Sequence, residues 1–386
     1  MVLVSAAVLG SLAWLLGVAL GFKLKRHLKR LVDWEPEGPA DATLTVVVPA
    51  RNEEHTLEAA TTTLLAQDLP GLRVALVDDR SDDGTAALVD ALAERDPRIE
   101  AHHVATLPEG WLGKTHAMSV GAAGATTDWL LFTDADVHFA PDALARAVAY
   151  AEAHSLDHLV LLPDLVAHGF GLQCAIAAFG RQFALSQRLW AVSDPASSAS
   201  AGVGAFNLVR REFFERTEGF EWFRMDVVDD VALGKLMKSA GARCDVLMGR
   251  DLVSVHWYET LSDMVRGLEK NTYAALGCRL HKVILAVTMM LLFDSAPWIA
   301  LHGLGVPGLP WLGALALAAG MGTGVILSRW ARQPLVPALL YPIGTLLVGF
   351  IMLRAGVLGA AKGGISWRDT FYSSKQLRKN ARVRFL

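Results

Sequence analysis

An apolar run that stops at two carboxylates constrains the fold of this 386-residue chain more than any other feature. The run, Trp-Leu-Leu-Phe-Thr-Asp-Ala-Asp at positions 129–136, predicts a buried strand of a parallel sheet. Ligands of open α/β sheets bind beyond the carboxyl ends of the strands, so Asp134 and Asp136 lie where a ligand is expected. Two carboxylates separated by one residue suit Mg²⁺ or Mn²⁺ bound to a diphosphate, because such ions complete their coordination with substrate oxygens. The alternative is a solvated strand end, where the same triplet occurs by chance.

Strands and helices alternate through the part of the chain around this run. The predicted strands are 45–48, 74–77, one that begins at 99, 129–133 and 158–162, with helical patterns such as 141–153 between them. Alternation of this kind implies right-handed crossovers and an α/β fold with a doubly wound, mostly parallel sheet. The acidic ends of several strands should then meet at one edge of the sheet.

The composition excludes several other classes of protein. A net charge of −3 gives no sign of a basic nucleic-acid-binding surface. Cys174, Cys244 and Cys278 lie far apart with no CxxC spacing, which indicates neither a disulfide framework nor a zinc site and fits a reducing compartment. At 53% hydrophobic residues, however, the chain is too apolar for an ordinary soluble protein.

Part of this apolar excess lies at the start of the chain. Residues 2–22 carry no charge, and about 20 such residues suffice to cross a bilayer. Lysines and arginines follow this run instead of preceding it, so we predict a transmembrane helix at 1–22 and not a cleaved signal peptide. The positive-inside rule places the basic juxtamembrane linker, residues 23–43, in the cytoplasm.

The rest of the excess lies in a predicted membrane region at 281–360, with candidate spans near 283–303, 309–328 and 336–358. Three full crossings from a cytoplasmic domain would leave the basic tail, 361–386, outside, against the positive-inside rule. Asp294 and Pro297 instead allow the first segment to be a re-entrant or interfacial hairpin. That arrangement returns the tail to the cytoplasm but exposes Arg329 and Arg332 on the outer side of the membrane. Both alternatives stay open.

Four motifs occur in a characteristic order between residues 44 and 280: TVVVPARNEE, LVDDRSDDGT, FTDAD and VVDDVALGKLMKSAG. They resemble the successive motifs of family 2 glycosyltransferases with the GT-A fold. The segments GWLGK at 110–114, GLEKN at 267–271 and GISW at 364–367 with Tyr372 are similar to bacterial hopene-associated and carotenoid (diaponeurosporenoate-type) glycosyltransferases. Leu268 and Glu269 depart from the more usual Trp-x of the GWxKN segment. The Q/R-x-x-R-W motif of processive enzymes is present only as Arg266 with Lys270.

The resemblance implies roles for individual residues. It assigns donor binding to Pro49, Arg51, Glu53, Asp79, Lys114 and Asp134, the metal to Asp134 and Asp136, and the acceptor side to Gly202, Gly204 and Arg266. Each role has a structural alternative. Glu53 can be a charge that favours a helix N-terminus, Asp79 a turn residue, and Lys114 a solvated side chain.

The resemblance also indicates the catalytic base. Asp230 sits where these enzymes carry the second acid of their Glu-Asp motif, and a carboxylate there can remove the proton of an acceptor hydroxyl. Asp229 and Lys270 are assigned supporting roles, while either acid can instead cap the helix that begins here. His256 is either a third metal ligand or a hydrogen-bonded structural histidine, so we do not assign it to the metal.

We therefore expect an inverting glycosyltransferase that lies in the cytoplasmic membrane and uses Mg²⁺ or Mn²⁺. We expect it to move a sugar from a nucleotide donor, foremost a UDP sugar, to a carotenoid, hopanoid or other lipid. Residues 170–192 and 260–278 can either lie in the headgroup plane or pack as buried helices. The alternatives are a polyprenyl-phosphate sugar transferase, a polysaccharide synthase and a non-catalytic nucleotide-binding membrane scaffold.

Overall fold

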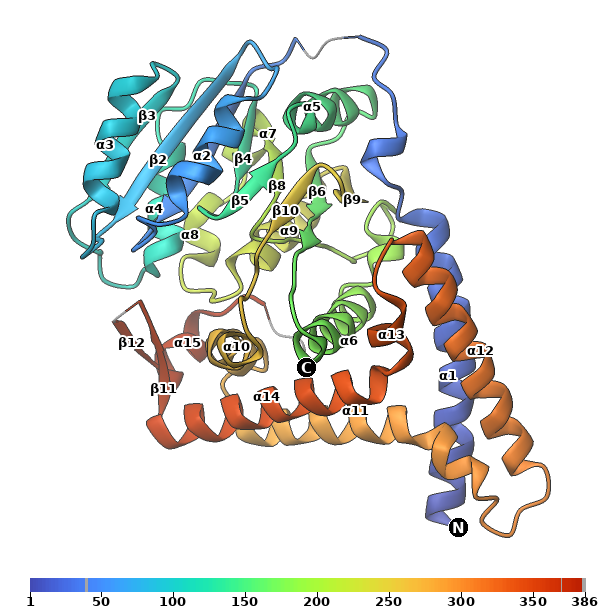
Figure 1. Cartoon of the computed structure of the whole chain (residues 1–386). Coiled ribbons are helices and arrows are strands. Elements are labelled where there is room, and N and C mark those ends of the chain that lie inside the picture. Colours follow the sequence, from blue (N-terminus) through green and yellow to red (C-terminus); the bar gives the residue numbers. More distant parts are fainter. Residues whose placement is uncertain (39–40, 369, 384–386) are drawn as a thin grey trace.

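A seven-stranded sheet forms the centre of the molecule, a computed structural model that describes residues 1–38, 41–368 and 370–383 (Figure 1). Its strand order is β3-β2-β1-β4-β8-β6-β9. The strands are β1 (Leu44–Ala50), β2 (Leu72–Asp79), β3 (Ile99–Val104), β4 (Trp129–Phe132), β6 (His158–Leu162), β8 (Asn207–Arg210) and β9 (Cys244–Met248). Neighbours pair in parallel except β8, which is antiparallel to β4 and β6. The predicted α/β fold with a mostly parallel sheet is therefore confirmed.

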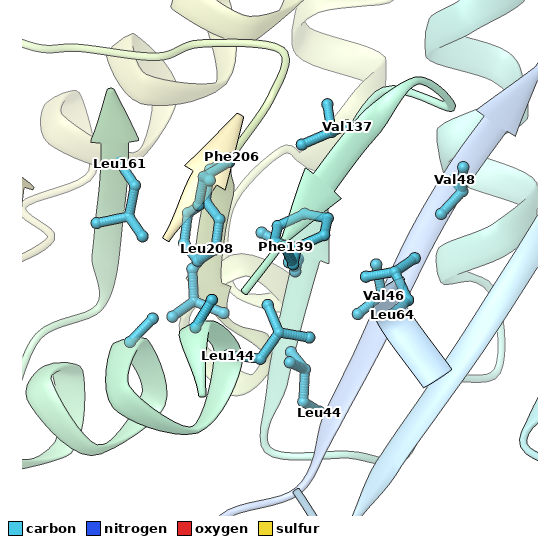
Figure 2. Close-up of a cluster of buried hydrophobic side chains, with 14 of the residues drawn as sticks. Leu44, Val46, Val48, Leu64, Val137, Phe139, Leu144, Leu161, Phe206 and Leu208 are labelled. Atoms are coloured by element: carbon cyan, nitrogen blue, oxygen red, sulfur yellow. The ribbon is translucent and has the colours of Figure 1, made fainter. Parts of the chain in front are cut away.

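Helices cover both faces of this sheet because alternate residues of each strand point to opposite sides. Val46 and Val48 of β1 pack in a cluster that includes Leu64 and Leu144 (Figure 2). Val47 between them belongs to the core on the other face. The covering helices are α2 (Leu57–Leu65), α3 (Thr85–Arg95) and α5 (Ala143–Ala153) on the first face, and α4 (Gly113–Ala122), α8 (Gly219–Phe223) and α9 (Asp229–Ser239) on the second. A short helix, α7 (Arg211–Glu215), follows β8.

A small second sheet continues from the carboxylate pair. Its strands are β5 (Val137–Phe139), β10 (Val253–Val255) and β7 (Asp164–Leu165), in the order β5-β10-β7. Val255 pairs with Val137, so Asp136 and His256 flank the same end of this strand pair. The chain thus turns directly from the end of β4 into a second layer, which holds Asp136 at the sheet edge.

Four helices are long and apolar enough to cross a membrane: α1 (Val2–His27), α11 (Leu280–Leu301), α12 (Leu309–Trp330) and α14 (Tyr341–Lys362). The third predicted C-terminal span, 336–358, is divided in the structure into α13 (Leu335–Leu339) and α14. Pro342 stands at the first turn of α14, where a missing N–H costs no helical hydrogen bond. This proline favours a new helix at that point.

Three of these helices, α1, α11 and α12, share one end remote from the sheet. Ala7, Ala300 and Leu309 form a cluster there, which joins the start of α1 to the α11–α12 connection. The opposite end of α1 packs through Leu28 into the core beneath the sheet, and Trp330 of α12 packs against the same core. Each of these helices therefore leads away from the catalytic domain or back to it.

The fourth helix, α14, lies along the underside of the domain beside α11 (Figure 1), where Gly356 of α14 lies against Val283 of α11. Near its start, Gly344 lies against Cys174 of α6 (Phe170–Ser186), and near its end Gly359 lies against Tyr273 of α10 (Leu261–Ala275). The side chain of Arg354, between these points, forms an ion pair with Glu269 of α10. Both ends of α14 are therefore held by helices of the catalytic domain.

The acid in the first predicted C-terminal span has a charged partner. Asp294 lies within α11, which continues unbroken through Pro297. Its Oδ2 is 2.6 Å from Nη2 of Arg181 on α6 and also accepts a hydrogen bond from Thr345 on α14. A buried charge of this kind is tolerated because it is paired. The pair ties α6, α11 and α14 together.

The C-terminal region 361–386, predicted as a basic tail, folds back beneath the catalytic domain. It forms a hairpin of β11 (Gly364–Trp367) and β12 (Thr370–Ser373), followed by α15 (Ser374–Asn380). The predicted linker 23–43 comprises the end of α1 and a 3₁₀ turn, Leu31–Asp33. Positions 39–40 of that linker and 384–386 of the tail lie outside the described residues.

The buried His158 generates a prediction about stability and pH. Burial lowers the pKa of His158 to about 4, although its ring hydrogen bonds to Oδ1 of Asn207 at 3.1 Å. The unfolded chain, with a histidine pKa near 6.5, binds more protons between pH 6.5 and pH 4, so stability should fall as the pH drops through this window. The slope is at most about 1.4 kcal/mol per pH unit.

Thermal unfolding of the detergent-purified protein between pH 4.5 and 7.5 measures this effect. The variant His158→Gln should flatten the acid side of the profile relative to the wild type, whereas the exposed control His55→Gln should not. Parallel profiles for wild type and His158→Gln would contradict the prediction.

Candidate active site

Lys114 is the centre of the candidate site. It is the second residue of α4, and its Nζ lies 2.7 Å from Oδ1 of Asp134 and 3.2 Å from Oδ2 of Asp229. Its side chain is 13% exposed, so it is not a solvated lysine. Burial alone lowers the pKa of Lys114, but the carboxylates of Asp134, Asp229 and Asp230 outweigh burial and raise it. The ammonium therefore stays charged and links the end of β4 to the start of α9.

The two carboxylates after β4 differ in their electrostatic surroundings. Burial acts to raise the pKa of Asp134, but the charge of Lys114 outweighs it and lowers the pKa. Burial raises the pKa of Asp136 to about 7, and the nearby charges of Asp134 and Glu53 add to the rise. Asp136 thus lies in a region with surplus negative charge.

Two glycines bring a loop close to these acids. The loop enters β8 from residues 199–206, and the backbone N–H of Asp134 donates a hydrogen bond to the carbonyl of Gly204 at 3.1 Å. A Cβ on Gly204 would collide with the Asp134 carboxylate, and one on Gly202 with the backbone of Asp230. The two predicted acceptor-side glycines therefore lie between the carboxylate pair and the start of α9.

Asp230 occupies the first turn of α9, and its Oδ1 accepts a hydrogen bond from the backbone N–H of Val231 at 2.8 Å. Burial raises the pKa of Asp230 to about 7, and the neighbouring charge of Asp229 adds to the rise. Asp229 itself is engaged with Lys114. The two acids are therefore distinct, since Asp229 neutralises a lysine while Asp230 is a carboxyl that binds a proton near neutral pH.

The ends of β1 and β2 form the next part of the site. Asp79, the last residue of β2, is fully buried, with its Oδ1 2.8 Å from Nε of Arg80. Pro49 is buried opposite Val77, and the Nη2 of Arg51 lies 4.0 Å from Oδ2 of Asp82.

Glu53 follows β1 and precedes α2. Its Oε2 accepts a hydrogen bond from the hydroxyl of Thr56 at 2.7 Å, and its backbone N–H donates to Thr85 at 2.8 Å. Burial raises the pKa of Glu53, while the charge of Arg368 acts in the opposite direction. Glu53 is thus fixed near the helix N-terminus and also lies within reach of the charges of the site.

Lys270 approaches the same cluster from α10. Its Nζ lies 4.2 Å from the ring centroid of Trp367 in the C-terminal hairpin. Burial lowers the pKa of Lys270 to about 7, and repulsion by Arg368 and Lys114 adds to the fall. Lys270 is therefore a buried amine that faces other cations of the site.

Two of the residues considered from the sequence lie apart from this cluster. The side chain of Arg266 is 68% exposed on α10 and pairs with Asp263 of the same helix at 3.1 Å. The structure therefore does not bring Arg266 to the predicted acceptor side, because α10 turns this position toward solvent. His256 is 48% exposed, with Nδ1 3.8 Å from Glu259, although it follows the strand that pairs beside Asp136.

Three further side chains belong to the cluster but were missed by the sequence reasoning. Arg80 and Arg368 flank Asp79. The half-buried Tyr258 lies within range of the Asp134 charge, and burial of its hydroxyl together with that charge raises the pKa of Tyr258. A Cβ on Gly267 would collide with the Tyr258 ring. The motifs around Trp367 and Gly267 were the available signals, but neither indicated which cluster they join.

The residues present fit a divalent cation with few protein ligands. Among the described positions, no group of three His, Cys, Asp or Glu side chains is arranged to hold a metal ion. Asp134 and Asp136 are two hard oxygen donors, and the surplus negative charge at Asp136 is what a cation would neutralise. Mg²⁺ or Mn²⁺ held by one or two carboxylates takes its remaining ligands from phosphate oxygens and water.

Comparisons with known proteins show which proteins this chain resembles. Residues 45–171 match the model of glycosyl transferase family 2. The chain is 23% identical over 264 residues to the 4,4'-diaponeurosporenoate glycosyltransferase of Staphylococcus haemolyticus (strain JCSC1435), across 67% of this chain and 68% of the relative. The protein of the same name from Staphylococcus aureus (strain USA300) is 23% identical over 269 residues, with the same two shares. The similarity to diaponeurosporenoate-type enzymes expected from the motifs is therefore confirmed.

A solved structure shares the fold over most of the chain. It is a mannosyltransferase from Pyrobaculum calidifontis in complex with GDP-Man and Mn²⁺, with a TM-score of 0.55 and 20% sequence identity across 93% of this chain and 99% of that chain. This likeness shows that the chain has the GT-A fold, and residues 45–171 form a domain that matches glycosyl transferase family 2.

Proposed function

We propose that the protein is a membrane-anchored, inverting glycosyltransferase that moves a sugar from a nucleotide-diphosphate donor, foremost a UDP sugar, to a hydroxyl or carboxyl of a lipid. The observation that carries this proposal is the position of Lys114, which bridges the carboxylate pair after β4 to the two acids of α9. Donor-binding and acceptor-activating groups then lie within one site.

The proposed reaction assigns a step to each acid. Asp230 takes the proton of the acceptor hydroxyl while that oxygen forms a bond to the anomeric carbon. The bond from this carbon to the diphosphate breaks on the opposite side, which inverts its configuration. Asp134 and Asp136 would hold a divalent cation, whose role is to stabilise the charge that develops on the leaving diphosphate. Lys114 and Lys270 add positive charge on the same side.

The surroundings of the site support a lipid acceptor. Lys270 is carried by α10, which rests on α14, and α14 exposes Leu346, Phe350 and Val357. An exposed apolar face of this size is typical of contact with a membrane. The curated relatives are named for a carotenoid acid, 4,4'-diaponeurosporenoate, which supports a carotenoid-like acceptor. A hopanoid or another lipid with a free hydroxyl fits the same apolar approach.

The connections of the apolar helices support a definite membrane topology. Residues 331–332, just after α12, contact the catalytic domain, where Arg332 lies 2.7 Å from Asp251 and the carbonyl of Ala331 accepts a hydrogen bond from Arg250. The hairpin after α14 also packs against this domain, where Arg368 lies 3.6 Å from Asp79. The chain between these points must cross the membrane an even number of times, and α13 is too short to cross.

We therefore propose that α1 and α12 cross the membrane, that the last turns of α11 carry the chain to the remote end, and that α14 and the part of α11 packed along it lie beneath the catalytic domain. Basic residues Lys25, Arg26, Arg329 and Arg332 all lie at the domain end of these helices, whereas the connection 302–308 at the remote end contains no lysine or arginine. The positive-inside rule then places the catalytic domain and the tail in the cytoplasm of a cell with one limiting membrane.

Cysteine labelling of intact cells tests this topology. The native cysteines are all buried, so the background should be low. A membrane-impermeant maleimide should label Val306→Cys in intact cells, but Gln333→Cys and Lys379→Cys only after permeabilisation. Labelling of Lys379→Cys from outside would mean that α14 crosses, and labelling of Gln333→Cys would place the domain outside.

The catalytic assignment is tested with Asp230→Asn, which keeps the shape of the side chain but cannot act as a base. Purified protein is incubated with UDP and GDP sugars, Mn²⁺ or Mg²⁺ and a total lipid extract, and lipids that gain a sugar mass are measured by mass spectrometry. We expect Asp230→Asn to lower the transfer rate about 10²-fold to 10⁴-fold, while donor affinity changes less than about twofold. The exposed control Asp142→Asn should behave as wild type.

The alternatives predict different results in the same experiment. A nucleotide-binding scaffold would bind donor but form no sugar-bearing lipid even as wild type. A polyprenyl-phosphate sugar transferase would form an acid-labile product, and a polysaccharide synthase would form a polymer. Full activity of Asp230→Asn would contradict its role as the base.

A further inference from the structure

The C-terminal hairpin forms one wall of the donor site, although it follows the last apolar helix. Trp367 pairs with Thr370 across the hairpin, and Arg368 directly follows β11. The guanidinium of Arg368 reaches back across the molecule, and its Nη1 lies 3.6 Å from Oδ2 of Asp79 at the end of β2. More than 280 residues of sequence separate these two groups.

The hairpin is held in this position from several sides. Tyr372 is buried, and a Cβ on Gly364 would collide with its carbonyl oxygen, so the two strands approach closely at the base of the hairpin. The backbone N–H of Ser374 donates to the carbonyl of Gly363 at 2.8 Å, directly at the end of α14. The turn that carries Arg368 is therefore positioned by the last turn of α14.

The charge of Arg368 acts on both halves of the site. It opposes the rise that burial causes in the pKa of Glu53, adds to the effect of Lys114 in lowering the pKa of Asp134, and adds to the effect of burial in lowering the pKa of Lys270. Glu53 and Asp79 follow β1 and β2, where the nucleoside is expected, while Asp134 and Lys270 lie on the side expected for the metal and the sugar. Arg368 is therefore close enough to both groups for its charge to act on them, and it lies 3.6 Å from Asp79.

The contact between Arg368 and Asp79 leaves hydrogen-bonding capacity unused on both sides. Oδ2 of Asp79 and Nη1 of Arg368 are buried atoms with no hydrogen-bond partner among the described residues, and 3.6 Å is too long for a hydrogen bond between them. A buried donor without an acceptor costs free energy unless a ligand satisfies it. A bound anionic oxygen would remove this cost for the Arg368 donor.

The backbone at Arg368 carries a second cost. Its φ is 48°, in the left-handed region that two-residue hairpin turns require but that Gly, Asn and Asp adopt most easily. A residue held in such a conformation costs conformational free energy and is found preferentially at functional sites. An arginine at this position is therefore unexpected for the turn alone and consistent with a role for its side chain.

We infer that Arg368 is a donor-binding residue whose guanidinium contacts the diphosphate of the nucleotide sugar, and that the hairpin β11–β12 completes the donor site. The inference rests on the proposed nucleotide-diphosphate donor and adds a residue outside all of the recognised motif positions. A planar guanidinium binds phosphate oxygens through two parallel N–H donors, which a lysine cannot reproduce. Arg368 would then exchange its incomplete contact with Asp79 for hydrogen bonds to phosphate.

The test measures affinities of the full-length protein in lipid nanodiscs with Mn²⁺ present. UDP and GDP are titrated first by calorimetry, and the tighter ligand and its parent nucleoside, uridine or guanosine, are then compared between wild type and Arg368→Gln. We expect Arg368→Gln to weaken diphosphate binding about tenfold to hundredfold, as for loss of a charged hydrogen bond, with nucleoside affinity unchanged. The exposed arginine variant Arg216→Gln should bind both ligands as wild type does.

Arg368→Lys keeps the positive charge and serves as a control for a folding defect. We expect it to bind the diphosphate with intermediate affinity, at a melting temperature equal to that of the wild type. Unchanged diphosphate affinity in Arg368→Gln, or an equal loss for diphosphate and nucleoside, would overturn the inference. If the wild type binds neither UDP nor GDP, the proposed donor itself fails, a result distinct from the failure of Arg368.

Discussion

The compensation of buried carboxylates by one lysine is the interaction on which the site depends. Asp134, Asp229 and Asp230 come from two elements that are almost 100 residues apart, and without a cation between them their mutual repulsion would oppose the packing of α9 against β4. Lys114 supplies that charge from the first turn of α4. Loss of one partner from a buried ion pair leaves an uncompensated charge, which costs several kcal/mol. The geometry of the site is therefore also a condition for the fold around it.

Charged side chains of α10 also connect the site to the apolar helices. Lys270 enters the site on α10, and α10 is joined to α14 by the Glu269–Arg354 ion pair. The end of α14 in turn holds the hairpin that places Trp367 over Lys270 and Arg368 beside Asp79. Acceptor-side and donor-side contacts thus both depend on α14. A change in the position of α14 at the membrane would therefore shift the side chains on both sides of the site.

The sequence predicted those parts of the structure that depend on local pattern. Buried apolar runs located β1, β2, β3, β4 and β6 but not β8 and β9, and the parallel order of β1, β2 and β4 then brought Asp79 and Asp134 to one edge. What sequence could not predict depends on helix rotation and on the path of distant segments. Arg266 was placed at the site because it is, with Lys270, the part of the Q/R-x-x-R-W motif that this chain keeps, yet the helix directs it to solvent. Arg368 was missed because its approach to Asp79 depends on how α11 to α14 return the chain. The division of the last predicted span into α13 and α14 could have been predicted from the prolines at positions 334, 337 and 342.

Anomalous diffraction at the manganese edge, from crystals grown with Mn²⁺ and UDP or GDP, tests the central claim most directly. The account predicts one manganese peak beside the carboxylates of Asp134 and Asp136, with the diphosphate on the side of Lys114 and the nucleoside over the ends of β1 and β2. A manganese ion bound elsewhere on the catalytic domain, or a nucleotide remote from these strand ends, would contradict it.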